Sequence, residues 1–188
     1  MPCAEEKRRL REQFSQLRHS ISAECKALWD AALCRAVLSH PAFLQADALL
    51  SFFAVRGEVD LSPVTEAALK KGIPVGYPRC EGREMRFFAI QSLADLRPDR
   101  FGIPAPHATC PALTPGKHTL CLLPGLAAGR DGSRLGYGGG FYDRFLEGFE
   151  GVTLFPVYDL LLTDTLPLEP TDQKVLHILT EKGEIAHV

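Results

Sequence analysis

The sequence lacks the features that mark a membrane or a secreted protein. No apolar run approaches the roughly 20 residues that a membrane-spanning helix needs. The N-terminal segment MPCAEEKRRLREQF is charged and has no apolar core of the kind found in a secretory signal peptide. The six cysteines form no CxxC pair and no two histidines form HxxxH, so we expect reduced thiols and no zinc site. We therefore expect a cytoplasmic protein.

The chain also lacks a charge excess, internal repeats and low-complexity tracts. A net charge of −2 gives no general attraction for nucleic acids or membrane surfaces, so we expect neither as a partner. With 46% apolar and 23% charged residues, the composition is that of an ordinary globular protein. We expect residues 1–188 to form a single domain, present as a monomer or a weak homodimer.

Short apolar runs alternate with amphipathic segments, which predicts an α/β domain with a mostly parallel sheet covered on both sides. Five prolines between residues 98 and 115 predict a long irregular connection there. The expected helices are residues 4–19, 22–40, about 60–72 and a segment starting at 141, and the expected strands are residues 48–54, 73–77, 85–90, 119–124, 152–158 and 174–180.

The chain has neither a Walker A loop nor a dinucleotide fingerprint, yet it concentrates glycine in one window. Six of its sixteen glycines lie between Gly129 and Gly140, directly before the expected helix FYDRFL. No GK[ST] follows, and Phe141 stands where the dinucleotide motif needs its third glycine. Glycine lets backbone N–H groups approach an anion closely. The window predicts a phosphate-binding loop for a nucleotide; a flexible surface loop is the alternative.

Charged residues surround this window. Arg134 and Arg144 flank the glycines, while Asp131 and Asp143 are candidate ligands for a divalent cation beside bound phosphates. Asp172, in EPTDQK, is either a second metal ligand or the cap of a turn. These residue types suit phosphate binding, because cations match the phosphate oxygens and carboxylates match Mg²⁺.

Other candidates lie far from the window in sequence. Lys7 and Arg11 are four residues apart and share a helix face, which either reaches a polyphosphate or is simply solvated. Glu58 follows the expected strand 48–54 and could accept hydrogen bonds from a polar heterocycle, or be a surface acid. Ligands of open α/β sheets bind beyond the carboxyl ends of the strands, so Glu58 and the glycine loop are expected to face one cleft.

Several segments together resemble the 5-formyltetrahydrofolate cyclo-ligase family, also called methenyltetrahydrofolate synthetase. The specific match is RLGYGGGFYDRFL at residues 134–146. Supporting matches, in the order that the family has them, are KRRLR at 7–11, GEVDLSP at 57–63, FGIPAP at 101–106 and LPLEPTD at 166–172. The resemblance implies a Rossmann-like three-layer α/β fold, similar to the NagB/RpiA/CoA-transferase type.

The resemblance also implies an activity and a set of site residues. Family members use ATP and Mg²⁺ to convert a reduced folate, 5-formyltetrahydrofolate, into 5,10-methenyltetrahydrofolate, releasing ADP and phosphate. The implied catalytic residues are Lys7, Arg11, Arg134 and Tyr142. The implied ATP-binding residues are Lys7, Arg11, Arg134, Leu135, Gly136, Tyr137, Gly138, Gly139, Gly140, Phe141 and Tyr142; Phe53 and Glu58 would bind the folate, and Asp143 and Asp172 the Mg²⁺.

The chain departs from the family pattern at five positions. Ala128 and Gly129 replace an aromatic residue and an acid, Leu161 a glutamine, Leu176 an aspartate, and Cys80 an aromatic residue. These changes concern the surroundings of the metal and the pterin rather than the phosphate-binding residues. The departures leave a non-catalytic folate- or nucleotide-binding paralogue as one rival function. A second rival, suggested by the glycine loop, is a sugar-phosphate or CoA-dependent enzyme on a similar sheet.

Overall fold

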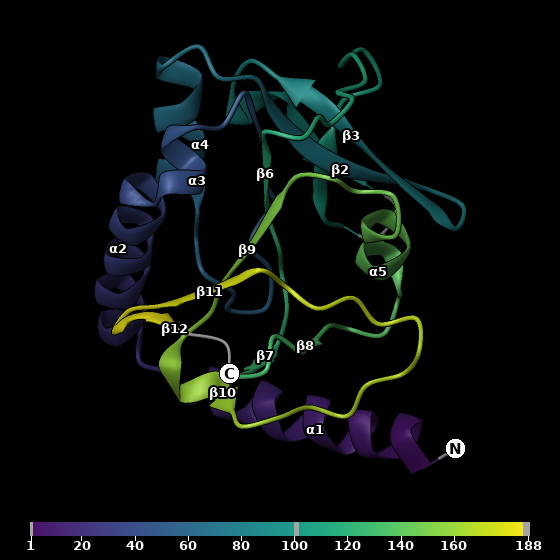
Figure 1. Ribbon diagram of the computed structural model, residues 1–188. Coiled ribbons are helices and arrows are strands. Elements are labelled where there is room, and N and C mark those ends of the chain that lie inside the picture. Colours follow the sequence, from purple (N-terminus) through teal and green to yellow (C-terminus); the bar gives the residue numbers. More distant parts are fainter. Residues whose placement is uncertain (1, 100–101, 186–188) are drawn as a thin grey trace.

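A computed structural model describes residues 2–99 and 102–185. Phe101, the first residue of the FGIPAP segment, lies outside the described residues. The centre of the fold is a seven-stranded sheet in the order β12-β11-β9-β6-β1-β2-β3 (Figure 1). Its strands are β1 (Ala48–Leu50), β2 (Val75–Glu81), β3 (Glu84–Ile90), β6 (Thr119–Leu122), β9 (Val152–Pro156), β11 (His177–Thr180) and β12 (Gly183–Ile185).

The sheet is mixed but mostly parallel, which confirms the predicted fold class. The five inner strands pair in parallel, and the edge strands β3 and β12 pair antiparallel with β2 and β11. The helices α2, α3 and α4 stand on one side of the sheet, α5 on the other, and α1 crosses below (Figure 1). They comprise α1 (Pro2–His19), α2 (Ala23–Ser39), α3 (Pro41–Leu44), α4 (Ser62–Lys70) and α5 (Phe141–Leu146).

Two small sheets complete the described structure. One joins β10 (Leu162–Thr163), β7 (Ala127–Gly129) and β8 (Arg134–Leu135). The other is the pair β4 (Leu96–Pro98) and β5 (Pro104–Pro106), so the predicted irregular connection contains a hairpin. Single-turn 3₁₀ helices, η1 (Leu93–Asp95) and η2 (Asp159–Leu161), precede β4 and β10. The small β7–β8–β10 sheet holds the start of the glycine loop.

The predicted strand 48–54 was too long, and the reason bears on the site. Regular pairing ends at Leu50, after which the Ser51 N–H donates to the Gly76 carbonyl at 2.9 Å. The chain then turns through Arg56 and Gly57, whose φ angles are +52° and +77°. Composition cannot reveal where the strand ends, because residues 52 and 53 are as apolar as the residues of a buried strand. The early end of β1 brings residues 52–58 to the carboxyl end of the sheet.

The core explains why these strands form the centre of the fold. Leu49, Leu50, Leu120, Leu122 and Leu154 are fully buried between the helical layers. Burying one such side chain stabilises the fold by about 1.5–3 kcal/mol. The cysteines of the described residues form no disulfide, and Cys34 and Cys121 are buried as small apolar residues. Among the described helices, none has the length and hydropathy to cross a membrane.

Candidate active site

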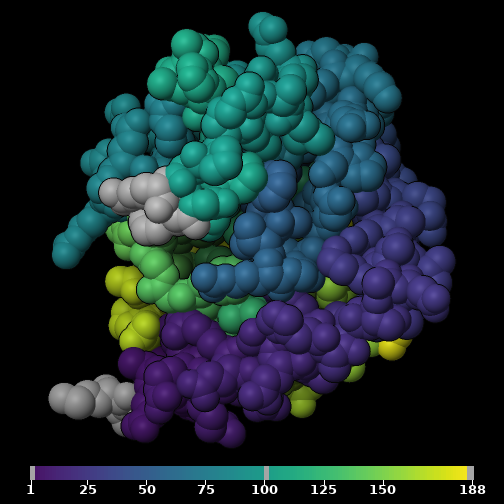
Figure 2. Space-filling view, turned by 180° about the vertical axis from the view of Figure 1, so that it is seen from behind, coloured from purple at the N-terminus to yellow at the C-terminus, as the bar shows by residue number. Residues whose placement is uncertain are grey.

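One cavity of about 1000 Å³ brings together every residue that the family resemblance implicated. Its wall is formed by α1, residues 52–58, the β2–β3 hairpin, the glycine loop and residues 169–172. These segments lie beyond the carboxyl ends of β1 and β6, where α/β sheets bind ligands. From behind, the green surface around the glycine loop lies between the purple surface of α1 and the teal middle of the chain (Figure 2).

The glycine loop connects β8 to α5 in a shape that side chains would disfavour. Gly138 and Gly140 have φ angles of +93° and +63°, a region that L-residues rarely adopt. A Cβ atom on Gly138 would lie 3.3 Å from the Arg11 guanidinium carbon, so the loop approaches α1 closely. Because α5 has six residues, the loop amides rather than a helix dipole are the groups suited to an anion here.

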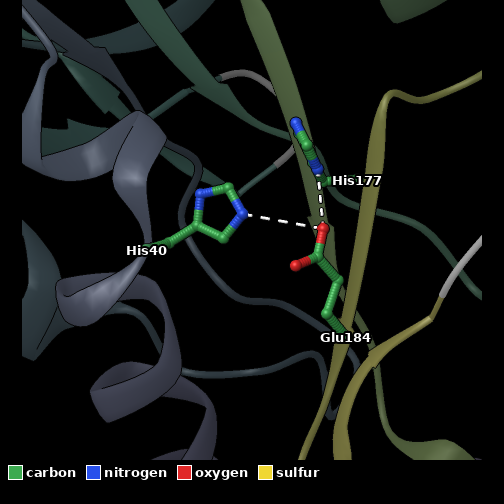
Figure 3. A group of neighbouring side chains, drawn as sticks. All are labelled: His40, His177 and Glu184. Atoms are coloured by element: carbon green, nitrogen blue, oxygen red, sulfur yellow. Dashed lines mark hydrogen bonds and ion pairs between the residues drawn. The ribbon is translucent and has the colours of Figure 1, made fainter.

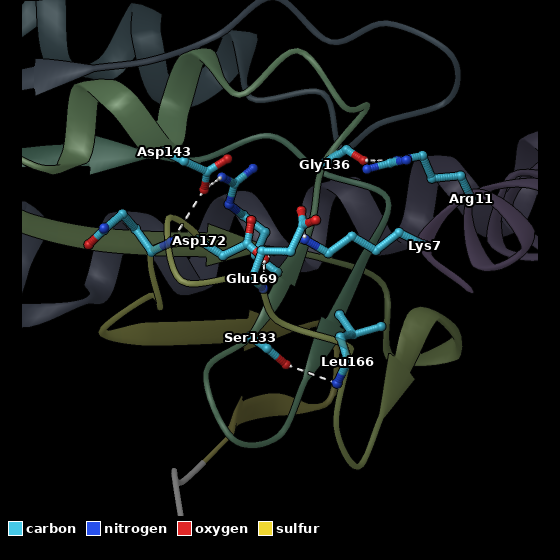
Figure 4. A network of polar contacts seen from close by, with 10 residues as sticks. Lys7, Arg11, Ser133, Gly136, Asp143, Leu166, Glu169 and Asp172 are labelled. Carbon is cyan, nitrogen blue, oxygen red and sulfur yellow. Dashed lines mark hydrogen bonds and ion pairs between the residues drawn. The ribbon is translucent and has the colours of Figure 1, made fainter. Parts of the chain in front are cut away.

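Lys7 is buried, so the alternative of a solvated basic face does not hold for it. Its Nζ donates a hydrogen bond to Glu169 Oε2 at 2.9 Å and a second one to Asp172 Oδ2 (Figure 4). Burial alone would lower the pKa of Lys7, but Asp172 and Glu169 raise it above its ordinary value. Arg11, one turn later, donates from Nε to the Gly136 carbonyl at 2.8 Å.

Arg134 and Asp143 form a second ion pair in the cavity wall. The Arg134 side chain is 4% exposed, and its Nη2 lies 3.0 Å from Asp143 Oδ1. Nη1 of Arg134 donates to the Pro124 carbonyl at 3.1 Å, which fixes the guanidinium beneath the loop. The Gln173 N–H also donates to Asp143 Oδ1, at 3.4 Å.

The two candidate metal ligands fit a hard divalent cation. Asp143 and Asp172 line the same cavity, and carboxylate oxygens are what Mg²⁺ prefers in proteins. The contacts of Asp143 go to Oδ1 and those of Asp172 to Oδ2, which leaves the second oxygen of each carboxylate for a cation. Asp131 is not brought into the cavity; it accepts hydrogen bonds from Ser133 and Lys174 instead.

Glu58 and Phe53 form the opposite part of the wall. Glu58 is 3% exposed, and its Oε2 accepts a hydrogen bond from the Val55 N–H at 3.0 Å. Burial raises the pKa of Glu58, against the lowering effects of the Val55 N–H and the Arg18 guanidinium. Phe53 is exposed toward the cavity, as an apolar surface for a flat ring.

Tyr137 of the glycine loop and Tyr142 of α5 face this region as neutral donors. Burial raises the pKa of the phenols of Tyr137 and Tyr142, so both remain protonated at neutral pH. Tyr137 accepts a hydrogen bond from Arg18 Nη1 at 2.8 Å, and the Arg56 guanidinium lies 5.1 Å from its ring centre. The Tyr142 ring centre lies 5.8 Å from the Arg134 guanidinium. A protonated phenol can donate to a phosphate oxygen.

Sequence reasoning missed Glu169 and Arg18. Glu169 shares Lys7 with Asp172, and although it lies within the matched segment LPLEPTD, only Asp172 of that segment had been given a role. Arg18 is seven residues after Arg11, about two helical turns further along α1, and this spacing was the available signal.

Of the five departures from the family pattern, Cys80 alone lines the cavity. Ala128 and Leu161 are buried in the core, and Leu176 is 55% exposed. A Cβ atom at Gly129 would clash with Ser133 Oγ and Asp131 Oδ1, so a larger residue there requires both side chains to move.

A histidine cluster lies outside the cavity lining and ties the last strand to the fold (Figure 3). His177 Nδ1 lies 2.7 Å and His40 Nε2 3.7 Å from Glu184 Oε1. His40 Nδ1 accepts the Ala42 N–H at 3.1 Å, so a neutral His40 carries its proton on Nε2, facing Glu184. A metal would need that nitrogen's lone pair, so the geometry suits a hydrogen-bonded clasp better than a metal centre.

The mostly parallel sheet, with one large charged cavity beyond the carboxyl ends of its strands, has the architecture of an α/β enzyme. The model of the 5-formyltetrahydrofolate cyclo-ligase family matches residues 3–181. The chain therefore belongs to that family, which is a family of ligases.

Relatives of known name and structure agree with this membership. The chain is 25% identical to mouse 5-formyltetrahydrofolate cyclo-ligase, with 93% of each chain covered. It is 28% identical to the Escherichia coli K12 cyclo-ligase, covering 77% of this chain and 83% of the relative. The solved 5,10-methenyltetrahydrofolate synthetase of Aquifex aeolicus superimposes with a TM-score of 0.85 at 28% identity, covering 95% and 91% of the two chains. A relative from Arabidopsis thaliana is named as mitochondrial, so the predicted cytoplasmic location stays a prediction.

Proposed function

We propose that this chain catalyses the ATP- and Mg²⁺-dependent cyclisation of 5-formyltetrahydrofolate to 5,10-methenyltetrahydrofolate, with release of ADP and phosphate. The supporting observation is that all the residues implied by the family motifs, from segments far apart in the sequence, line one cavity. Family membership supports the substrate class. The chain is proposed to act as a single domain.

The reaction needs an activated formyl oxygen. In the proposed first step, the oxygen of the N5-formyl amide attacks the γ-phosphorus of ATP, and ADP leaves with the electrons of the broken P–O bond. The resulting iminophosphate has a good leaving group. N10 then attacks the formyl carbon, its proton passes to solvent, and inorganic phosphate departs with the former formyl oxygen. Because phosphoryl transfer depends on positioning and charge neutralisation, the chain needs no dedicated general base for the first step.

The two ion pairs of the cavity would exchange partners when the nucleotide binds. Lys7 and Arg134 are held by Asp172 and Asp143 in the structure. We propose that both cations turn to phosphate oxygens, while the two carboxylates hold Mg²⁺. When bound, Mg²⁺ neutralises charge on the phosphates. The exchange keeps each buried charge paired, and an unpaired buried charge would be costly.

The remaining loop residues would fix the nucleotide. The amides of residues 136–141 present N–H groups to the triphosphate, and Arg11 holds the loop through the Gly136 carbonyl. The Tyr142 phenol, protonated because burial raises its pKa, would donate to a phosphate oxygen. These roles assign the phosphate end of the cavity to ATP.

The folate would occupy the end of the cavity that contains Glu58 and Phe53. An ionised Glu58 accepts hydrogen bonds from the N–H groups of a pterin, and Phe53 offers a flat apolar face. This position would place the N5-formyl group between the pterin site and the glycine loop.

An absorbance assay tests the proposal. Purified protein is mixed with 5-formyltetrahydrofolate and Mg²⁺, with and without ATP, and the absorbance of the conjugated methenyl product is followed. We expect product only with ATP, and none from Asp143→Ala. Binding of both ligands without product would support the non-catalytic paralogue. Failure to bind either would support the sugar-phosphate or CoA-dependent alternative.

A further inference from the structure

Arg18 is a buried cation that links α1 to both ends of the cavity. It is 4% exposed, and its Nη1 donates to the Tyr137 hydroxyl at 2.8 Å. Its Nη2 donates to the carbonyls of Gly125 and Leu126, the latter at 3.0 Å. A Cβ atom on Gly57 would lie 3.4 Å from Arg18 Cδ, so the Glu58 segment packs directly against the arginine stem. Three separate segments therefore meet on one arginine side chain.

The carboxylate of Glu58 faces this guanidinium and is only partly satisfied. Its Oε2 accepts from Val55, whereas Oε1 is buried without a hydrogen-bond partner among the described residues. Nε of Arg18 is likewise buried without a hydrogen-bond partner among the described residues. The charged or titratable groups that face Glu58 are Arg18 from α1, Tyr137 from the glycine loop and Tyr142 from α5, together with the backbone at Val55 and Gly125.

We propose that Arg18 is a positioning residue that couples the folate site to the ATP site, by fixing Tyr137 of the glycine loop and by balancing the buried charge of Glu58. This inference rests on the proposed function. The planar fork of arginine is essential to it, because one guanidinium must reach a hydroxyl and two carbonyls at once. Arg18 reaches the reacting groups only through Tyr137 and Glu58.

The charge of Arg18 has a measurable consequence. Burial raises the pKa of Glu58, and the Arg18 charge opposes that rise. Removing the charge would raise the pKa further, so the carboxylate would take up a proton at a higher pH. A protonated carboxyl group accepts hydrogen bonds from the pterin N–H groups less well than a carboxylate does. In a variant without the Arg18 charge, the KM for folate should therefore increase as the pH falls. This increase should begin at a higher pH than in the wild type.

Two substitutions separate the charge from the fork. Arg18→Gln removes both, while Arg18→Lys keeps a charge but cannot reach all three acceptors. Arg8→Gln is the matched control, since Arg8 lies on the same helix and its side chain is 66% exposed. Carboxyl ¹³C NMR of each protein gives the titration midpoint of Glu58, whose resonance is assigned by its loss in Glu58→Gln.

We expect Arg18→Gln to raise the titration midpoint of Glu58 by about one pH unit or more. The pH below which the KM for folate increases should rise by the same amount. Arg18→Lys should leave the midpoint near that of the wild type and raise the KM for ATP by roughly tenfold, because the loop loses a charge-assisted contact. Arg8→Gln should change neither quantity. An unmoved midpoint in Arg18→Gln would overturn the charge role, and unmoved ATP kinetics in Arg18→Lys the coupling role.

The test stands apart from the proposed activity and from folding defects. The NMR midpoint needs no turnover, so a wild type that makes no methenyl product would refute the proposed function while the charge role remained measurable. If Arg18→Gln does not fold, Tyr137→Phe replaces it. That variant keeps the charge and removes the hydroxyl that Arg18 holds. In Tyr137→Phe, we expect a bound ATP analogue to change the affinity for folate less than it does in the wild type. An equal change in both proteins would overturn the proposed coupling between the two sites.

Discussion

Lys7, in the first helix, donates a hydrogen bond to Asp172, which lies 165 residues later in the chain. The contact closes the cavity between α1 and the segment after β10, and Glu169 joins it at 2.9 Å. A buried lysine with two acids is well placed to exchange one of them for a phosphate. The pair therefore relates the packing of the N-terminal helix to the proposed nucleotide site.

Replacing Lys7 should impair ATP use more than folate binding. In Lys7→Ala, a charge-assisted contact to phosphate is lost, which corresponds to about 1.5–3 kcal/mol and roughly 10–100-fold in the KM for ATP. The measurement is steady-state kinetics with each substrate varied in turn. Arg8→Ala, exposed on the same helix, is the control and should behave as the wild type. A larger change for folate than for ATP would remove Lys7 from the phosphate site.

Arg134→Ala should raise the KM for ATP and lower turnover. The substitution also leaves Asp143 without its 3.0 Å partner, so we expect a reduced melting temperature as well. Arg134→Lys keeps the charge but lacks the planar guanidinium, so it separates the effect on stability from the effect on ATP kinetics. Compared with Arg134→Ala, it should restore the melting temperature more than the turnover. Unchanged ATP kinetics in Arg134→Ala, measured on folded protein, would reject the assignment of the glycine loop.

The conformation of the glycine loop can be tested at Gly138. Its φ angle of +93° strains any L-residue, and an added Cβ would lie 3.3 Å from the Arg11 guanidinium carbon. Gly138→Ala should cost about 1 kcal/mol of stability or more and raise the KM for ATP. Gly148→Ala is the matched control, because nothing lies within 4 Å of the added methyl group. Equal behaviour of the two variants would contradict the described loop.

The histidine clasp predicts a pH-dependent contribution to stability. Partial burial would raise the pKa of Glu184, but the hydrogen bond and charge of His177 and the nearby His40 lower it below the ordinary value of 4.5. A carboxyl with a depressed folded-state pKa stabilises the fold above its ordinary pKa and loses that effect as the pH falls through the folded value. Thermal unfolding of Glu184→Gln should thus show a lower melting temperature than the wild type at pH 6. The difference should shrink below about pH 4.5, and a constant difference would exclude the ionic contribution.

Features set by local sequence could be predicted. The glycine loop was recognisable because its proposed function depends on backbone shape, which closely spaced glycines indicate directly. The start of the second helix is another local feature, because serine favours the N-cap position and the Ser22 hydroxyl accepts the Cys25 N–H. The mostly parallel sheet followed from the alternation of apolar runs and amphipathic segments. Glu58 was already a candidate because it follows an expected strand, whereas Phe53 was singled out only by the family resemblance.

Features that depend on contacts across the chain could not be predicted. The pairs Lys7–Asp172 and Arg134–Asp143 require the fold before their partners are known. The end of β1 depends on the turn at Arg56, a residue type that rarely adopts a positive φ. Arg18 appeared to be one more charge on a charged helix, and its burial is visible only when α1 is packed against the carbonyl of Leu126.

The most direct test of the account follows the formyl oxygen. The protein is supplied with ATP, Mg²⁺ and 5-formyltetrahydrofolate that carries ¹⁸O in the formyl group, and the released phosphate is examined by mass spectrometry or ³¹P NMR. Transfer of the formyl oxygen to the γ-phosphoryl group predicts one ¹⁸O atom in each inorganic phosphate, with one ADP formed for each methenyl product. Unlabelled phosphate, with the ¹⁸O released into water, would contradict the iminophosphate route.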